Sequence, residues 1–374
     1  MPRVGTRIRE SGNTSPLREL CYDDRVPVDG NIVQGSYLKD LLDQPEALED
    51  TCTGLAENPS ITQLAARLAQ REFARVVLTG MGSSYHALHP LNLQLITHGV
   101  PSALLETSEL VHSMRNLLEP GTLVVAVSQS GESAEIIRLL DVTPARSFLI
   151  AVTNSEHSSL AAKAHATVLI NAGAESGVAC KTFVSSLVGL EWLGALLCGR
   201  DLDNIRCELR QAAPAASAYL RDWKCHVTDW CGLLAGVRAI FITGRGSSLA
   251  AAGSGALITK EAAHFPAEAM SSASFRHGPF EMVGDQTFVV VYSGDPASAD
   301  RNQRLVEDII AAGGRAGLAG SNSKHKVLRL PAVPQSVRPI VEILPIQMMS
   351  LALATLAGRE PGKFQFVSKV TTVE

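Results

Sequence analysis

Hydroxyl and amide side chains gather in the sequence VSQSGES, which contains Ser128, Gln129, Ser130 and Ser133. An apolar run precedes this sequence, and a segment with helical periodicity follows it. A strand, a short turn and the start of a helix would place these groups and backbone N–H groups at the positive end of a helix dipole, which suits an anion such as phosphate. Serines and glycines in such turns also cap helices without a ligand. The stretch alone leaves both interpretations open.

A second serine pair follows another apolar run. In ARVVLTGMGSSY, Ser83 and Ser84 come directly after Gly80 and Gly82, and glycines permit positive φ and close approach of the backbone to a ligand. The third glycine of a dinucleotide fingerprint is replaced by Tyr85, so NAD is not expected. Ligands of parallel sheets bind at the carboxyl ends of the strands, so the two serine turns are expected to share one anion.

The first of these motifs has a second copy. Gly80 of TGMGSS falls 164 residues before Gly244 of TGRGSS, and the same shift maps the apolar run 124–127 on 288–291. In each copy, short apolar runs alternate with longer segments of helical periodicity, which indicates parallel strands covered by helices. We therefore expect an α/β protein of two tandem domains, each a five-stranded parallel sheet sandwiched by helices.

The elements that position these turns can be placed along the chain. Strands are predicted at 75–79, 102–105, 122–127, 147–152 and 167–170, and again at 239–243, 267–269, 287–292, 315–319 and 326–330. Helices are predicted at 84–97, 132–141, 179–198, 248–264 and 338–357, with a helical connection over 201–235. The predicted organisation is an N-terminal arm (1–35), a first domain (36–205), a second domain (206–360) and a C-terminal tail (361–374).

Composition and charge narrow the class of protein. The 374 residues are 46% apolar and 19% charged, with a net charge of −4, which favours a globular protein and disfavours a nucleic-acid partner. Polar residues interrupt the long apolar stretches, and the first residues lack a signal-peptide core, so we expect a cytoplasmic protein without a membrane segment. Seven cysteines without a C-x-x-C pair indicate reduced thiols, and neither a metal nor a cofactor is expected.

Several motifs together resemble one family. GMGSSY, SQSGES, ESGVACKTF, GRGSS, TKEAAHFPAEAMSSASFRHGP and the terminal SKVTTVE are similar, in the same order, to the double sugar isomerase (SIS) family. The resemblance runs from about residue 36 to 374 and is strongest to the isomerase half of glucosamine-6-phosphate synthase and to stand-alone deaminases. It implies a sugar phosphate ligand and a homodimer whose active site is shared between subunits.

The resemblance also implies roles for individual residues. The sugar phosphate would be held by Ser83, Ser84, Ser128, Gln129, Ser130 and Ser133, and the sugar would be lined by Val178 and Ala179, in a loop that also carries Lys181. Neutral hydroxyls and amides suffice for the phosphate because the helix terminus supplies partial positive charge. Glu261 would move a proton between C1 and C2, and His277 would assist ring opening, serving the neighbouring subunit.

Lys369, near the end of the chain, matches a family lysine that can form a Schiff base with the ketose carbonyl. We expect Phe364, Phe366 and Val367 to dock the tail, and Val373 to pack, so that Lys369 lies in a desolvated pocket without a strong negative charge. The alternative is a solvated tail.

The sequence departs from the family in places that concern the substrate. The loop GVACKTF is one residue shorter than usual and has Cys180 where a hydroxyl is expected, and Ile258 replaces a lysine of the synthases. The chain begins MPRVG without a glutaminase domain, so glutamine-dependent synthesis is not expected. We predict an amino sugar phosphate deaminase. The alternatives are a phosphosugar isomerase, a deglycase of phosphorylated fructosyl amino acids and a non-catalytic phosphosugar-binding regulator.

Overall fold

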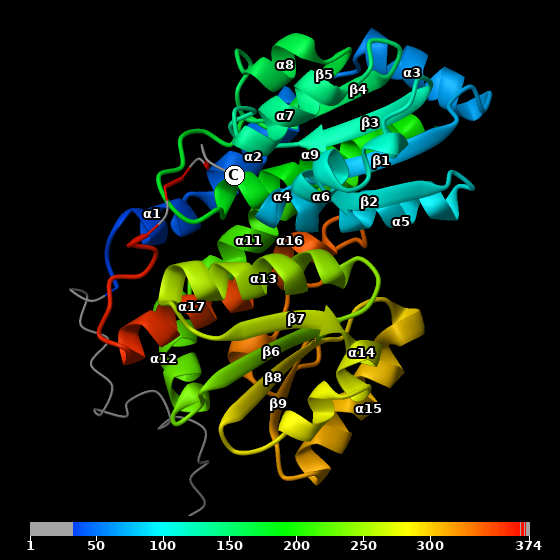
Figure 1. Cartoon of the computed structure of the whole chain (residues 1–374). Helices are drawn as coiled ribbons and strands as arrows, with labels where there is room; N and C mark the ends of the chain where they lie inside the picture. Colours follow the sequence, from blue (N-terminus) through cyan, green and yellow to red (C-terminus); the bar gives the residue numbers. More distant parts are fainter. Residues whose placement is uncertain (1–32, 367, 370, 372–374) are drawn as a thin grey trace, which may run out of the picture.

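The computed structural model describes residues 33–366, 368, 369 and 371. The predicted N-terminal arm therefore lies almost wholly outside the described residues, as do Val367 and Val373. Two parallel sheets lie one above the other, with a layer of helices between them (Figure 1). The predicted α/β fold with two tandem domains is confirmed.

The first sheet has the strand order β2-β1-β3-β4-β5, and all its strand pairs are parallel. Its buried apolar runs form strands because β-branched and other apolar side chains pack on both faces of a parallel sheet. The strands are β1 (Arg75–Gly80), β2 (Ser102–Glu106), β3 (Thr122–Val127), β4 (Phe148–Thr153) and β5 (Ala166–Leu169).

The second sheet has the order β7-β6-β8-β9 and is also parallel. Its strands are β6 (Ala239–Gly244), β7 (Ala267–Ser271), β8 (Thr287–Tyr292) and β9 (Arg315–Ala319). The fifth strand predicted at 326–330 is wrong. Its residues form the 3₁₀ turn η3 (Lys326–Leu328) and one isolated bridge between Gly320 and Arg329, and the Tyr219 hydroxyl donates to the Val327 carbonyl at 2.6 Å.

The layer between the sheets consists mainly of buried helices. Every residue of α9 (Lys181–Leu197) is buried, as an apolar helix without a polar face requires. α13 (Ser248–Ala263) packs on α17 (Leu344–Leu356) and on α4 (Gly82–Ala87), so one continuous core joins both domains. The segment Arg338–Leu356 is long and apolar enough to cross a membrane, but 89% of it is buried inside the protein, as in a core helix.

The remaining helices cover the outer faces, connect the domains or lead into the first sheet. The single helix predicted at 84–97 is two helices, because Pro90, in the first turn of α5, has no N–H to donate to the preceding turn. The bounds are α1 (Ser36–Leu42), α2 (Gln44–Gly54), α3 (Pro59–Ala69), α5 (His89–Thr97), α6 (Thr107–His112), α7 (Ala134–Val142), α8 (Ser159–Lys163), α10 (Leu202–Leu209), α11 (Ala212–Leu220), α12 (Trp223–Leu234), α14 (Ser272–Arg276), α15 (Pro296–Ala311) and α16 (Arg338–Glu342), with 3₁₀ turns η1 (Arg115–Leu117) and η2 (Pro279–Met282).

Candidate active site

The two serine turns meet at one edge of the first sheet. β1 and β3 are neighbours, and their register pairs Gly80 with Val127, so both strands end at the same level. A Cβ on Gly80 would lie 3.0 Å from the Tyr85 nitrogen and 3.1 Å from the Val127 carbonyl oxygen, so only glycine lets the turns come this close. The β1–β3 edge is also where the strand order reverses, which is the usual ligand site of such sheets.

The turn after β3 is arranged around the start of α7. The Ser128 hydroxyl accepts from the Gly131 N–H at 3.1 Å, and the Ser130 hydroxyl accepts from the Glu132 N–H at 3.2 Å. Ser133 is the N-cap of α7, and its side chain makes no capping hydrogen bond to the helix. The positive end of the α7 dipole and this turn, which carries four polar side chains, therefore lie at the same edge of the sheet.

The C-terminal tail reaches this edge. It leaves α17 in the second domain and passes α1 on its way to the first domain (Figure 1). Along this path the Gly362 N–H donates to the Ala262 carbonyl of α13 at 3.0 Å, and the Thr371 carbonyl accepts from the Ala134 N–H of α7 at 3.1 Å. The tail is thus tied to both domains, and its Thr371 lies at the start of α7, which follows the serine turn.

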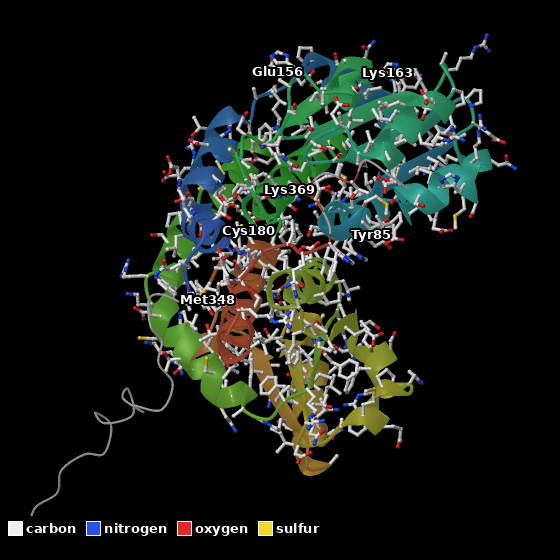
Figure 2. All side chains as sticks on the ribbon, turned by 60° about the vertical axis from the view of Figure 1, so that its left-hand side comes forward. Tyr85, Glu156, Lys163, Cys180, Met348 and Lys369 are labelled. Carbon is white, nitrogen blue, oxygen red and sulfur yellow. The ribbon has the colours of Figure 1, made fainter. Side chains whose placement is uncertain are left out.

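Lys369 is fixed by a buried carboxylate. Its ammonium group donates to Glu175 Oε2 at 2.6 Å and to the Gly177 carbonyl at 2.7 Å, and Figure 2 shows it in the lower half of the first domain, near Cys180. The Glu175 side chain is 0% exposed, and the Lys369 side chain is 23% exposed. The expectation of a lysine away from strong negative charge is therefore wrong. Phe364 packs against the core as predicted, but Phe366 is 94% exposed and does not dock on this chain.

Glu175 is a site residue that the sequence reasoning missed. Its carboxylate also accepts from the Cys180 N–H at 2.8 Å, from the Thr182 N–H at 3.1 Å and from the Thr182 hydroxyl at 2.6 Å. It therefore holds the first turn of α9, where a carboxylate is stabilised by the helix dipole. Its position two residues before Gly177, in the motif ESGVACKTF, was the available signal.

The same loop positions the residues predicted to line the sugar. Val178 is buried and Ala179 is half-buried, while Lys181 pairs with Asp40 at 3.0 Å. Cys180 is fully buried, and burial, with smaller contributions from Glu175 and Asp40, raises the pKa of its thiol well above the ordinary value. Cys180 is therefore a neutral thiol rather than a nucleophile.

Glu261 lies in the last turn of α13, within electrostatic range of Lys369. Burial raises the pKa of Glu261 from 4.5 to about 7, Lys369 and Lys260 lower it, and Glu175 raises it. Half-protonation near neutral pH suits a group that must both accept and donate a proton. The structure thus brings Glu261, Lys369 and Glu175 together.

Two predicted residues stand apart from this group. The Ser83 hydroxyl hydrogen-bonds with the Ser254 hydroxyl of α13 at 3.1 Å. His277 is exposed just after α14, and Figure 1 shows α14 on the opposite side of the second domain from the tail. A single chain therefore does not bring His277 to Lys369. Among the described residues, no cluster of three or more His, Cys, Asp or Glu side chains could hold a metal ion.

Comparisons with known proteins agree with this architecture. The model of the SIS domain family matches the chain twice, at residues 68–194 and 233–357. The isomerizing glutamine–fructose-6-phosphate aminotransferase of Pyrococcus horikoshii is 30% identical over 349 residues, which are 90% of this chain and 57% of that protein. This chain thus spans little more than half the length of that relative.

Solved structures share the fold. The C-terminal domain of glucosamine-fructose-6-phosphate aminotransferase from Francisella tularensis superposes with a TM-score of 0.78 at 23% identity, covering 89% of this chain and 99% of that domain. Glucosamine-6-phosphate deaminase from Thermotoga maritima superposes with a TM-score of 0.71 at 18% identity, covering 91% of this chain and 100% of that one.

Proposed function

This chain belongs to the SIS domain family, and we propose that it is an amino sugar phosphate deaminase, converting a glucosamine-6-phosphate-like aldose into a ketose phosphate and ammonia. The observation that carries the proposal is that Glu261 lies within electrostatic range of the Lys369–Glu175 pair, and that the tail carrying Lys369 reaches the start of α7 beside the serine turn. The similarity to an isomerizing aminotransferase and the fold shared with a deaminase support this substrate class.

The phosphate end of the substrate would lie against the turn after β3. The hydroxyls of Ser84, Ser128, Ser130 and Ser133 and the amide of Gln129 supply neutral donors, and the α7 terminus adds partial positive charge. Thr371 accepts from the first N–H of α7, so the tail would lie over the bound sugar and limit access of water.

The proton transfer would use Glu261. Its carboxylate removes the proton from C2 of the open-chain amino aldose, the C2–H electrons form the C1–C2 double bond, and O1 takes a proton. Return of the proton to C1 leaves an imine at C2. One water molecule then adds to C2 and ammonia leaves, which yields the ketose. A carboxyl group with a pKa of about 7 can perform both transfers at neutral pH.

Lys369 would act first as a cation. Held by Glu175 and Gly177, its ammonium group can donate a hydrogen bond to the carbonyl oxygen on which negative charge develops. A Schiff base at C2 would require Lys369 to lose a proton, and Glu175 is the adjacent acceptor. In that route the lysine amine displaces ammonia from C2, and water later releases the ketose.

His277 would reach the substrate from a second subunit. It lies away from Lys369 in its own chain, so ring opening by His277 requires a homodimer with a shared site. The exposed Phe366, three residues before the tail lysine, is an apolar group that a partner subunit would cover.

The test is a substrate panel. The purified protein is incubated with amino sugar phosphates and with phosphorylated fructosyl amino acids, while ammonia, free amino acid and ketose phosphate are measured, and the Glu261→Gln variant serves as the control. Equal amounts of ammonia and ketose phosphate support the deaminase. Release of amino acid would instead assign a deglycase, and saturable binding without turnover would assign a binding regulator.

A further inference from the structure

A cavity of about 430 Å³ lies at the carboxyl edge of the second sheet, in the position that the serine turns occupy in the first domain. Its walls come from the ends of β8 and β9, the first turns of α15, and the chain around α16. The repeat makes Ser248 the counterpart of Ser84, and Ser293 the counterpart of Gln129. The volume is within the range of small-molecule sites, about 300–1,000 Å³.

The chemistry of this edge does not suit a phosphate. Asp295 is the N-cap of α15, where the first domain has Ser133 before α7, and Pro296 removes the first N–H of the helix. Asp300, one turn further along α15, places a carboxylate in the cavity wall. These acidic groups and the missing N–H replace the neutral donors of the first domain, so a cationic group is favoured here over a phosphate.

One wall of the cavity carries an unsatisfied carboxyl group. The Glu342 side chain is fully buried and its Oε1 accepts from the Ser248 hydroxyl at 2.9 Å, but its Oε2 has no hydrogen-bond partner among the residues that the structure describes. Burial raises the pKa of Glu342 to about 8. Asp295 also raises this pKa, whereas the Ser248 hydrogen bond and the positive charge of Arg338 lower it. A ligand that donates to Oε2 would supply the missing partner.

A guanidinium lines the same cavity. Arg338 donates to the Gly294 carbonyl through Nη1, which also lies 3.9 Å from Asp295 Oδ1, and the side chain is 23% exposed. A guanidinium has five N–H groups in a planar fork, so it can bind a carboxylate while it keeps this bond. The cavity therefore combines one group for an anion with acidic groups for a cation.

Apolar side chains complete the lining. Leu318, Leu330, Val333 and Val341 line the cavity together with Arg338 and Glu342. We propose that this cavity is a second ligand site, which binds a free α-amino acid with an apolar side chain. Its carboxylate pairs with Arg338, its ammonium group donates to Glu342 Oε2, and its side chain contacts the leucines and valines. The proposal concerns the second domain alone and is independent of the reaction at the first.

Isothermal titration calorimetry of the 374-residue chain tests this site, with leucine as the probe. Isoamylamine, which lacks the carboxylate, and N-acetylleucine, which lacks the ammonium group, should each bind at least about tenfold more weakly than leucine. Glu342→Gln and Arg338→Gln should weaken leucine binding by a similar factor. Arg304→Gln, at an exposed position of α15 outside the cavity walls, is the matched control and should bind like wild type.

Three results would overturn the proposal. They are the absence of leucine binding to the wild type at millimolar concentration, tighter binding of unphosphorylated glucosamine than of leucine, and undiminished leucine binding by folded Arg338→Gln. If Glu342→Gln does not fold, the partly exposed Arg338 still decides the question. Ser130→Ala separates the two domains, because it alters the first site and should leave leucine binding unchanged.

Discussion

Replacement of Glu175 by glutamine tests the role of the ion pair beneath the tail. The amide can still accept from the Cys180 and Thr182 N–H groups, and the Thr182 hydroxyl can rotate to accept from the new NH₂ group. What is lost is the 2.6 Å charge-assisted bond from Lys369. Such a bond contributes about 1.5–3 kcal/mol, so deaminase turnover should fall about 10- to 100-fold while the fold is kept.

The Glu175→Gln substitution should also shift the pH dependence of turnover in a defined direction. Ionised Glu175 raises the pKa of Glu261, so Glu175→Gln should lower that pKa below about 7. Glu261 accepts the C2 proton only when it is ionised, so activity is lost as the pH falls through its pKa. The acidic limb of the pH–rate profile should therefore move to lower pH in Glu175→Gln. It should move to higher pH in Lys369→Gln, because Lys369 lowers the pKa of Glu261.

The assay is steady-state ammonia release from glucosamine-6-phosphate between about pH 5 and 9, a range that brackets the pKa of Glu261. KM should change little, because the serine turns are untouched. Glu156→Gln, at an exposed position at the far end of the first domain (Figure 2), is the matched control. Wild-type turnover in Glu175→Gln, or an acidic limb that moves to higher pH, would mean that Glu175 controls neither Lys369 nor the pKa of Glu261.

Three further predictions concern the predicted site residues. Ser130→Ala should weaken sugar-phosphate binding about tenfold or more, since a hydrogen bond to a charged group contributes about 1.5–3 kcal/mol; calorimetry that shows equal affinity for Ser130→Ala and for the surface control Ser60→Ala would move the phosphate elsewhere. Mixed dimers of Glu261→Gln and His277→Ala subunits should regain activity if His277 acts across the dimer, and confirmed hybrids without activity would place the whole site in one chain. Borohydride reduction with ketose phosphate should leave a sugar-sized mass on the C-terminal peptide of wild type and none on that of Lys369→Ala, and turnover without any trapped adduct would restrict Lys369 to an electrostatic role.

Local sequence patterns were sufficient to predict most of the fold. The apolar runs at 75–79 and 122–127 are strands β1 and β3 to within a residue, because buried parallel strands require continuous apolar residues. The repeat revealed the second domain. The strand predicted from the apolar run at 326–330 does not form. The Tyr219 hydroxyl donates a hydrogen bond to the Val327 carbonyl, and the chain forms a 3₁₀ turn there instead of a strand.

Only some of the site residues could be predicted from the sequence. Motif order pointed to Glu261 and Lys369, but no local pattern tells which buried carboxylate faces a lysine 194 residues away, so Glu175 was missed. We also expected Phe366 to dock as an apolar residue of the tail, whereas this side chain is 94% exposed on the single chain. Contacts between distant segments depend on how the two domains enclose the tail, and that follows from packing rather than from local pattern.

In the proposed reaction, Glu261 moves the C2 proton of a phosphorylated amino sugar. The most direct test is to supply glucosamine-6-phosphate deuterated at C2 and to follow deuterium by NMR as ketose phosphate forms. Wild type should remove deuterium from C2, with part of it appearing at C1, whereas Glu261→Gln should bind the sugar with similar affinity but remove deuterium about 10²–10⁴ times more slowly. Deuterium loss at the wild-type rate in Glu261→Gln would contradict this role of Glu261.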